Sequence, residues 1–131
     1  MAEWIYANPN PRKRITGDCV VRAVSLATEQ SWDETFTMVA LTALAMHDMP
    51  SSNKVWRLYL KSLGFRRREV PDTCPDCYTV ADFADDHPKG TFVVGTGTHA
   101  VCIIDGKCYD TWDSRPETIE FYYYKQEDQD A

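Results

Sequence analysis

The segment Thr16-Gly17-Asp18-Cys19-Val20-Val21-Arg22-Ala23 places a small-residue turn directly before the start of an amphipathic helix. Asp18 is a residue type suited to the N-cap, and the apolar spacing after it predicts a helix through about Glu29. Cys19 then falls in the first turn of that helix, where unpaired backbone N–H groups and the helix dipole stabilise a thiolate. We therefore expect Cys19 to be a reactive thiol and a candidate nucleophile.

A short apolar hairpin later in the chain carries the partners that a nucleophilic cysteine requires. Two strand-like runs, residues 99–104 and 107–112, are separated by Asp105-Gly106, a strong signal for a two-residue turn. With that turn, side-chain alternation puts Asp110 on the same face as His99, as its diagonal neighbour. We expect these two side chains to lie within hydrogen-bonding reach of each other.

A nucleophilic cysteine needs a general base, and the base needs an orienting group. Cys19, His99 and Asp110 supply these roles as nucleophile, general base and orienting acid. Asp113 is the alternative acid, because a one-residue bulge at Trp112 would exchange the faces of the two carboxylates. The set is suited to acyl transfer through a thioester.

The remaining pattern predicts one α+β domain over residues 1–131, with N-terminal helices packed on a C-terminal antiparallel β-sheet. Residues 1–17 form an extended arm, since Pro9 and Pro11 exclude a helix, and residues 126–131 form a frayed tail. Helices are expected at 18–29, 31–49, 53–63 and 79–86, and strands at 65–70, 91–95, 99–104, 107–112 and 118–124.

The composition bears on the cellular compartment of the protein and on the oxidation state of its cysteines. Hydrophobic residues make up 44% of the chain, which favours a folded core. No apolar run approaches the ~20 residues that cross a bilayer, and the N-terminus lacks the features of a signal peptide. We expect a cytoplasmic protein without a membrane partner. Five cysteines are an odd number, which favours reduced thiols over a disulfide framework.

The net charge of −6 argues against general nucleic-acid binding, which needs a positive field. Two basic runs, Arg12-Lys13-Arg14 and Arg66-Arg67-Arg68, are interpreted as solvated loop or strand edges. We therefore expect no nucleic-acid partner. The oligomeric state is left open.

The order of these motifs resembles the papain-like cysteine peptidases. In that superfamily a cysteine opens the first long helix, a histidine opens a hairpin, and the polar orienting residue commonly precedes a Ser-Trp pair. Here His99-Ala100-Val101 and Asp110-Thr111-Trp112 occupy the matching places. The chain also looks like small bacterial and phage proteins with a Gly-Asp-Cys-Val-x-Arg-Ala start and a Tyr-Asp-Thr-Trp-Asp-Ser hairpin end. The resemblance implies a papain-like fold and hydrolysis of a peptide or isopeptide bond, so that the expected partner is a peptide or protein substrate, with no cofactor and no metal.

One position departs from the family pattern. Papain-like peptidases usually carry a glutamine six residues before the cysteine, which donates into the oxyanion hole, and here that position is Lys13. Asn8 or Asn10 is the candidate replacement donor, together with the backbone N–H of Cys19. The alternative role for both asparagines is turn chemistry beside proline.

Two other classes of function stay open. One is an inactive papain-like binding module, which the missing glutamine favours. The other is a zinc or redox protein built on Cys74-Pro75-Asp76-Cys77, because two thiols at this spacing bind zinc or cycle between thiol and disulfide. Cys102 and Cys108 do not complete a zinc site in this interpretation, since their positions in the hairpin put them on opposite faces of the sheet. Deamidation, transamidation and acyl transfer to an amine are further reactions open to the same cysteine.

Overall fold

Six strands form one mixed sheet in the computed structural model, which describes residues 1–125. The order across the sheet is β1-β5-β4-β3-β6-β2. Neighbouring strands are antiparallel except β1 and β5, which run parallel. The strands are β1 (Glu3–Tyr6), β2 (Phe65–Glu69), β3 (Thr91–Gly95), β4 (Ala100–Ile104), β5 (Lys107–Asp110) and β6 (Phe121–Lys125).

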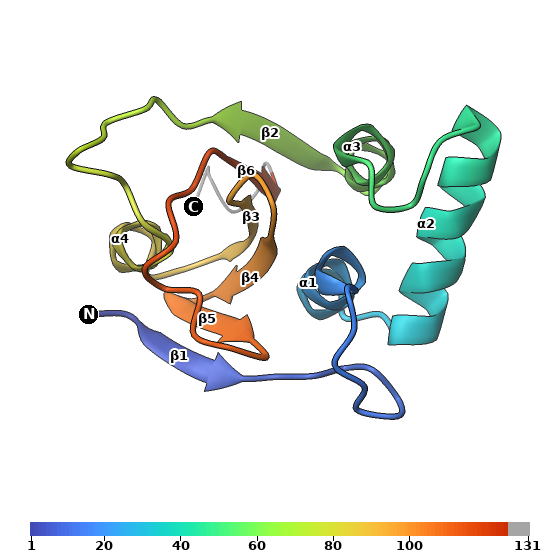
Figure 1. Cartoon of the computed structure of the whole chain (residues 1–131), viewed down its shortest axis with the longest axis horizontal. Coiled ribbons are helices and arrows are strands. Elements are labelled where there is room, and N and C mark those ends of the chain that lie inside the picture. The colour runs from blue at the N-terminus through green and yellow to red at the C-terminus, as the bar shows by residue number, and fades with distance from the viewer. Residues whose placement is uncertain (126–131) are drawn as a thin grey trace.

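Helices cover both faces of this sheet, as Figure 1 shows, with α1, α2 and α3 on one side and α4 on the other. Side chains therefore alternate between two apolar cores, with Val93 and Cys102 facing α1–α3, and Phe92 and Ile103 facing α4. Within residues 1–125, none of the helices has the length and apolar character needed to span a bilayer. The helices are α1 (Cys19–Thr28), α2 (Trp32–Met46), α3 (Asn53–Ser62) and α4 (Val80–Asp86).

Three of the helices begin at capping residues that the sequence predicts. Ser31 accepts a hydrogen bond from the backbone N–H of Glu34 at 3.0 Å, and Ser52 caps α3 in the same manner. Thr79 and Asp82 form a reciprocal capping box at α4, with bonds of 3.2 and 3.1 Å. Local hydrogen bonding thus fixes where these helices start.

The turn between β4 and β5 confirms the predicted register of the hairpin. Ile104 lies opposite Lys107, and the two residues between them, Asp105 and Gly106, have φ angles of 50° and 77°. Positive φ at both positions is the requirement of the tight hairpin turn. The register also places Cys102 and Cys108 on opposite faces of the sheet, as expected.

The α+β class is confirmed, but the expected wholly antiparallel sheet is wrong at its edge. The predicted extended arm contains β1, which pairs with β5 so that Tyr6 lies opposite Asp110. The Trp4 indole N–H also donates to the Asp110 carbonyl at 3.2 Å. A short strand whose partner is about a hundred positions away in sequence gives no local signal of that pairing. The predicted tail at 126–131 lies outside the described residues.

Candidate active site

Cys19 is the first residue of α1, and its side chain is half-buried. α1 differs from the other three helices because its N-cap residue, Asp18, makes no capping hydrogen bond. The Asp18 carboxylate instead binds the Arg22 guanidinium and accepts a bond of 2.9 Å from the Trp32 indole N–H. The first turn around Cys19 therefore stays without a side-chain cap, a favourable setting for a thiolate.

The pKa of the Cys19 thiol lies below its ordinary value. Burial raises this pKa, but hydrogen bonds from the His99 side chain and the Ala100 backbone N–H lower it, as do the positive charges of His99 and Arg22. The lowering contributions together outweigh burial. The thiolate is thus stabilised by two neighbouring residues at the start of β4 and by one cation on α1.

His99 lies immediately before β4, where a tight turn returns the chain. The His99 carbonyl accepts a hydrogen bond from the Thr96 backbone N–H at 2.9 Å, and Gly97 within this turn has a φ of 92°. A Cβ atom on Gly97 would lie 2.8 Å from a Glu120 carboxylate oxygen, so a side chain there requires Glu120 to move. The turn holds His99 at the end of the sheet that faces Cys19.

The His99 imidazole is a stronger base than a free histidine. Burial lowers its pKa, but hydrogen bonds with Asp110 and Cys19 and the charges of both partners raise it to about 9. A lowered thiol pKa beside a raised imidazole pKa favours a thiolate–imidazolium pair near neutral pH.

Asp110, the last residue of β5, accepts a hydrogen bond of 2.6 Å from His99 Nε2 on its Oδ2 atom. Its side chain is 2% exposed, and burial raises its pKa. Hydrogen bonds from His99, Ser114 and the backbone N–H of Thr111 outweigh this effect and hold the pKa below its usual range. The carboxylate is therefore ionised and fixed in position beside the imidazole.

Two buried residues that the sequence interpretation missed contact the Asp110 carboxylate in addition to His99. Ser114, which is 1% exposed, donates its hydroxyl to Asp110 Oδ2 at 2.7 Å. Arg22, which is 5% exposed, lies between two carboxylates: it binds Asp18 through one guanidinium nitrogen and approaches Asp110 Oδ1 at 3.4 Å with the other. The sequence carried one signal for the role of Arg22, namely a charged residue three positions after Cys19 on the predicted helix. A charge on the buried face of a helix needs a partner of opposite charge.

Trp112 shields the histidine rather than filling the core. Its ring centroid lies 4.7 Å from that of His99, and 43% of the residue is exposed. The indole therefore covers the outer side of the His99–Asp110 pair and limits the access of water to it.

Cys19 and His99 open onto a cleft of about 680 Å³. One wall consists of residues 16–21 and the other of residues 97–100, so the cleft lies between the helices and the sheet. Residues 8–15 of the arm are not among the residues that line it. The cleft continues over apolar rings from α2, α3 and β6, namely Trp32, Phe36, Trp56 and Phe121.

The two candidate oxyanion donors lie away from this cleft, so the geometry does not support their predicted role. The Asn8 amide donates to the Arg14 carbonyl at 3.3 Å, and its oxygen accepts from the Asn10 backbone N–H at 3.1 Å. The Asn10 oxygen accepts from the backbone N–H of Arg12 at 2.9 Å. Both asparagines organise the turns of the arm, which is the alternative that the neighbouring prolines favour. Asn53 is the one residue with a side-chain amide among the described residues that line the cleft.

The two other acids near the hairpin are engaged elsewhere. Asp113 forms two hydrogen bonds of 2.7 Å with the Arg115 guanidinium. Asp105 accepts a bond of 3.0 Å from the backbone N–H of Gly90. Of these three acids, Asp110 is the one that contacts His99.

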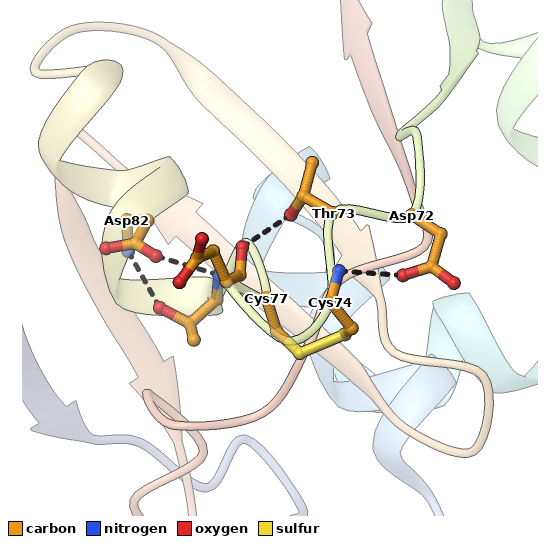
Figure 2. Close-up of a disulfide and its surroundings, with 7 residues drawn as sticks. Asp72, Thr73, Cys74, Cys77 and Asp82 are labelled. Atoms are coloured by element: carbon orange, nitrogen blue, oxygen red, sulfur yellow. Dashed lines mark hydrogen bonds between the residues drawn. A yellow bond between two sulfur atoms is a disulfide. The ribbon is translucent and has the colours of Figure 1, made fainter.

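Cys74 and Cys77 form a disulfide in an exposed loop before α4, as Figure 2 shows. The expectation that reduced thiols are favoured is therefore wrong for this pair, because the two-residue spacing brings the two cysteines together within one turn, and it holds for Cys19, Cys102 and Cys108. Asp72 accepts a bond of 2.9 Å from the Cys74 backbone N–H, and the Thr73 hydroxyl donates to the Asp76 carbonyl at 2.6 Å. Within residues 1–125, no three His, Cys, Asp or Glu side chains gather in a geometry suited to a metal ion.

The arrangement of Cys19, His99 and Asp110 is thus a continuous chain of interactions that ends at an open cleft. Comparisons with protein-family models, curated proteins and solved structures give no match for this chain. The activity of the chain is therefore inferred from its own residues and their geometry.

Proposed function

We propose that this chain is a papain-like cysteine hydrolase that cleaves a peptide or isopeptide bond through a thioester. The observation that carries the proposal is the placement of a low-pKa thiol, Cys19, beside a histidine held by a buried carboxylate, at the edge of a cleft. A nucleophile, a base and an orienting acid in mutual contact are the recurring arrangement of acyl-transfer enzymes.

The first half of the reaction uses the thiolate–imidazolium pair. The Cys19 sulfur attacks the substrate carbonyl carbon, and the π electrons of the carbonyl move onto its oxygen. Collapse of this tetrahedral intermediate breaks the C–N bond, and His99 transfers its proton to the departing amine. The products of this half are a free amine and an acyl group bonded to the Cys19 sulfur.

In the second half, His99 acts as the general base. It takes a proton from water as the water oxygen attacks the thioester carbonyl, and the C–S bond then breaks to release a carboxylic acid and the Cys19 thiolate. Asp110 keeps the imidazole in the same orientation throughout, because Ser114 and the Thr111 backbone N–H hold its carboxylate at 2.7 Å each. An amine in place of water would turn the same step into a transamidation.

The oxyanion of the tetrahedral intermediate requires N–H donors near Cys19. The backbone N–H of Cys19 itself and the uncapped first turn of α1 supply the positive end of a helix there. Asn8 and Asn10 have no part in this proposal, since their amides bind within the arm.

The proposal is tested by turnover of a library of internally quenched peptides. We expect cleavage by the wild-type protein and a loss of more than about 1,000-fold in the Cys19→Ala variant, as for removal of a catalytic nucleophile. The Cys102→Ala variant is the matched control, since that thiol lies inside the core, and it should keep the wild-type rate. Equal cleavage by wild type and Cys19→Ala would remove the nucleophile from the proposal.

A binding module without catalysis is the second candidate. The observation that favours it is the replacement of the usual glutamine by Lys13, whose ammonium donates to the Asn8 carbonyl at 2.8 Å rather than entering the cleft. A module of this kind would bind peptides in the cleft equally well in the wild-type and Cys19→Ala proteins and would release them uncleaved. Mass spectrometry of the peptide library after incubation separates the two candidates.

A further inference from the structure

A second surface of the molecule gathers positive charge from two separate elements. Arg57 and Lys61 lie one turn apart on α3, and Arg66, Arg67 and Arg68 lie on β2. Together they line a groove of about 580 Å³, here called the basic groove, with Tyr123 and Tyr124 of β6 also among its lining residues. The run on β2 was interpreted as a solvated strand edge, but that interpretation does not account for the cations that α3 adds.

Within the described part of the chain, the charge of the basic groove is balanced only in part. Within residues 1–125, Arg67 forms an ion pair with Glu69 at 2.8 Å, and the other cations of this groove form none. The chain as a whole carries a net charge of −6, so the groove is a positive region on a molecule whose net charge is negative. Like charges gathered without partners repel one another, and an anionic ligand would relieve that repulsion.

Two of the guanidinium groups are held in place by aromatic rings. Arg67 lies over the Phe121 ring at 4.0 Å and donates to the Tyr123 hydroxyl at 3.2 Å, and Arg68 lies over the Tyr124 ring at 5.0 Å. Such contacts fix the planar groups before any ligand arrives. Less conformational entropy is then lost when a carboxylate binds.

The backbone of β2 is open on one side. β2 is the last strand of the sheet and pairs with β6 alone, and Figure 1 shows it at the outer edge of the fold. Alternate residues of an edge strand direct their N–H and C=O groups outward, where an extended peptide can add as a further strand. Nucleic acid cannot use this ladder of backbone groups in the same way.

We propose that the basic groove and the free edge of β2 bind an acidic, extended segment of a polypeptide partner. The segment adds antiparallel or parallel to β2 through main-chain hydrogen bonds, and its carboxylates bind Arg66 and Arg68. The linings of the groove and the cleft are in contact, because Arg67 of the groove lies over the ring of Phe121, which lines the cleft. Binding does not require the reaction at Cys19, so it is tested on Cys19→Ala protein.

The probe is a fluorescein-labelled eight-residue peptide of alternating Glu and Thr, with a Lys-Thr peptide of equal length as its charge control. Fluorescence anisotropy should show saturable, salt-sensitive binding of the Glu-Thr peptide and none of the Lys-Thr peptide. The double variant Arg66→Ala/Arg68→Ala should bind about tenfold more weakly or worse, as expected for the loss of charged hydrogen bonds. The double variant Arg12→Ala/Arg14→Ala removes the same charge from the arm and should stay within about twofold of wild type. Circular dichroism confirms that both variants are folded.

Strand addition has its own test in the same assay. A Glu-Thr peptide with an N-methyl group on every residue has no backbone N–H to donate to the ladder and should bind at least about tenfold more weakly. Unchanged binding of this peptide would overturn strand addition. Absence of binding to the Glu-Thr peptide, equal losses in the two double variants, or tighter binding of an octathymidine would overturn the acidic-peptide assignment. None of these outcomes depends on turnover, so they leave the proposed hydrolase activity untouched.

Discussion

Cys19 and Cys102 are two free thiols packed against the same apolar core, yet their surroundings change their acidity in opposite directions. Burial raises the pKa of both. For Cys102, fully enclosed in β4, burial and the neighbouring Cys108 raise the pKa well above its ordinary value. For Cys19, hydrogen bonds from His99 and the Ala100 N–H help to lower the pKa below its ordinary value. Ala100 and Cys102 lie two residues apart on the same face of β4, so one strand both activates one thiol and inactivates another.

The contrast teaches that burial alone does not decide the reactivity of a thiol in this molecule, because its partners can outweigh the effect of burial on its pKa. Burial is the largest single influence on the pKa of Cys19, yet the hydrogen bonds and charges around the thiol together exceed it. The start of α1 supplies a favourable field in addition. Changes to the partners of Cys19 should therefore alter its reactivity while leaving Cys102 as it is.

The largest difference should appear in alkylation at pH 6. With iodoacetamide, we expect Cys19 to react at least about 100-fold faster than Cys102 or Cys108, because only the thiolate attacks and burial raises the pKa of Cys108 to about 11. Mass spectrometry of tryptic peptides over a time course locates and times each modification. Equal rates at the three free thiols of the folded protein would erase the contrast.

Removal of His99 should bring Cys19 closer to the behaviour of Cys102. In the His99→Ala variant the hydrogen bond and the positive charge that lower the thiol pKa are both lost, so that pKa rises. We expect the Cys19 alkylation rate at pH 6 to fall at least about tenfold and its pH profile to shift upward, in line with a change of one pKa unit or more. The same rates measured from pH 5 to pH 9 provide the check. An unchanged profile would assign the activation to the helix start alone.

The orienting acid should have a smaller effect, and it is tested by a matched pair. We expect Asp110→Ala to lower turnover at least about tenfold, since His99 then loses its partner at 2.6 Å. Asp113→Ala should change turnover less than about threefold, because Asp113 binds Arg115 instead. Quenched-peptide kinetics on both variants supply the measurement. The reverse ranking would move the orienting role to Asp113.

The smallest effect concerns stability, where the order of the two thiols reverses. Cys102→Ser puts a hydroxyl into a fully buried apolar site and should cost about 1–3 kcal/mol of unfolding free energy. Cys19→Ser keeps a hydroxyl near His99 at the open cleft and should cost less than about 1 kcal/mol. Urea titrations followed by tryptophan fluorescence measure both values. A loss of more than about 3 kcal/mol for Cys19→Ser would mark Cys19 as a core residue.

Much of the fold and of the candidate site follows from local signals. Capping residues at Ser31, Ser52 and Thr79 and the Asp105-Gly106 turn are short-range features, and each lies where the sequence predicts. The turn also sets the hairpin register, from which the pairing of His99 with Asp110 was expected and is observed.

Sequence reasoning missed two residues that contact Asp110, one from a distant helix and one from the adjoining loop. Arg22 on α1 contacts Asp110 on β5, and Ser114, in the loop after that strand, donates a hydrogen bond to the same carboxylate. Taken alone, an arginine on a helix or a serine in a loop is an ordinary surface residue. The two asparagines of the arm illustrate the converse, since their amides are satisfied by neighbours rather than by a distant site.

The sequence by itself determined the helix starts, the tight turn and the alternation of side chains, because each depends on φ and ψ preferences and hydrogen bonds within a few residues. Only the tertiary structure decided that β1 closes the sheet beside β5, that Arg22 lies between two carboxylates, and that cations of α3 and β2 share one groove. The contacts of β1 with β5 and of Arg22 with Asp110 join segments far apart in the chain, whereas α3 and β2 are consecutive elements whose relative placement is set by packing. The energies of all three features arise from desolvation and charge contacts that exist only after the segments have packed together.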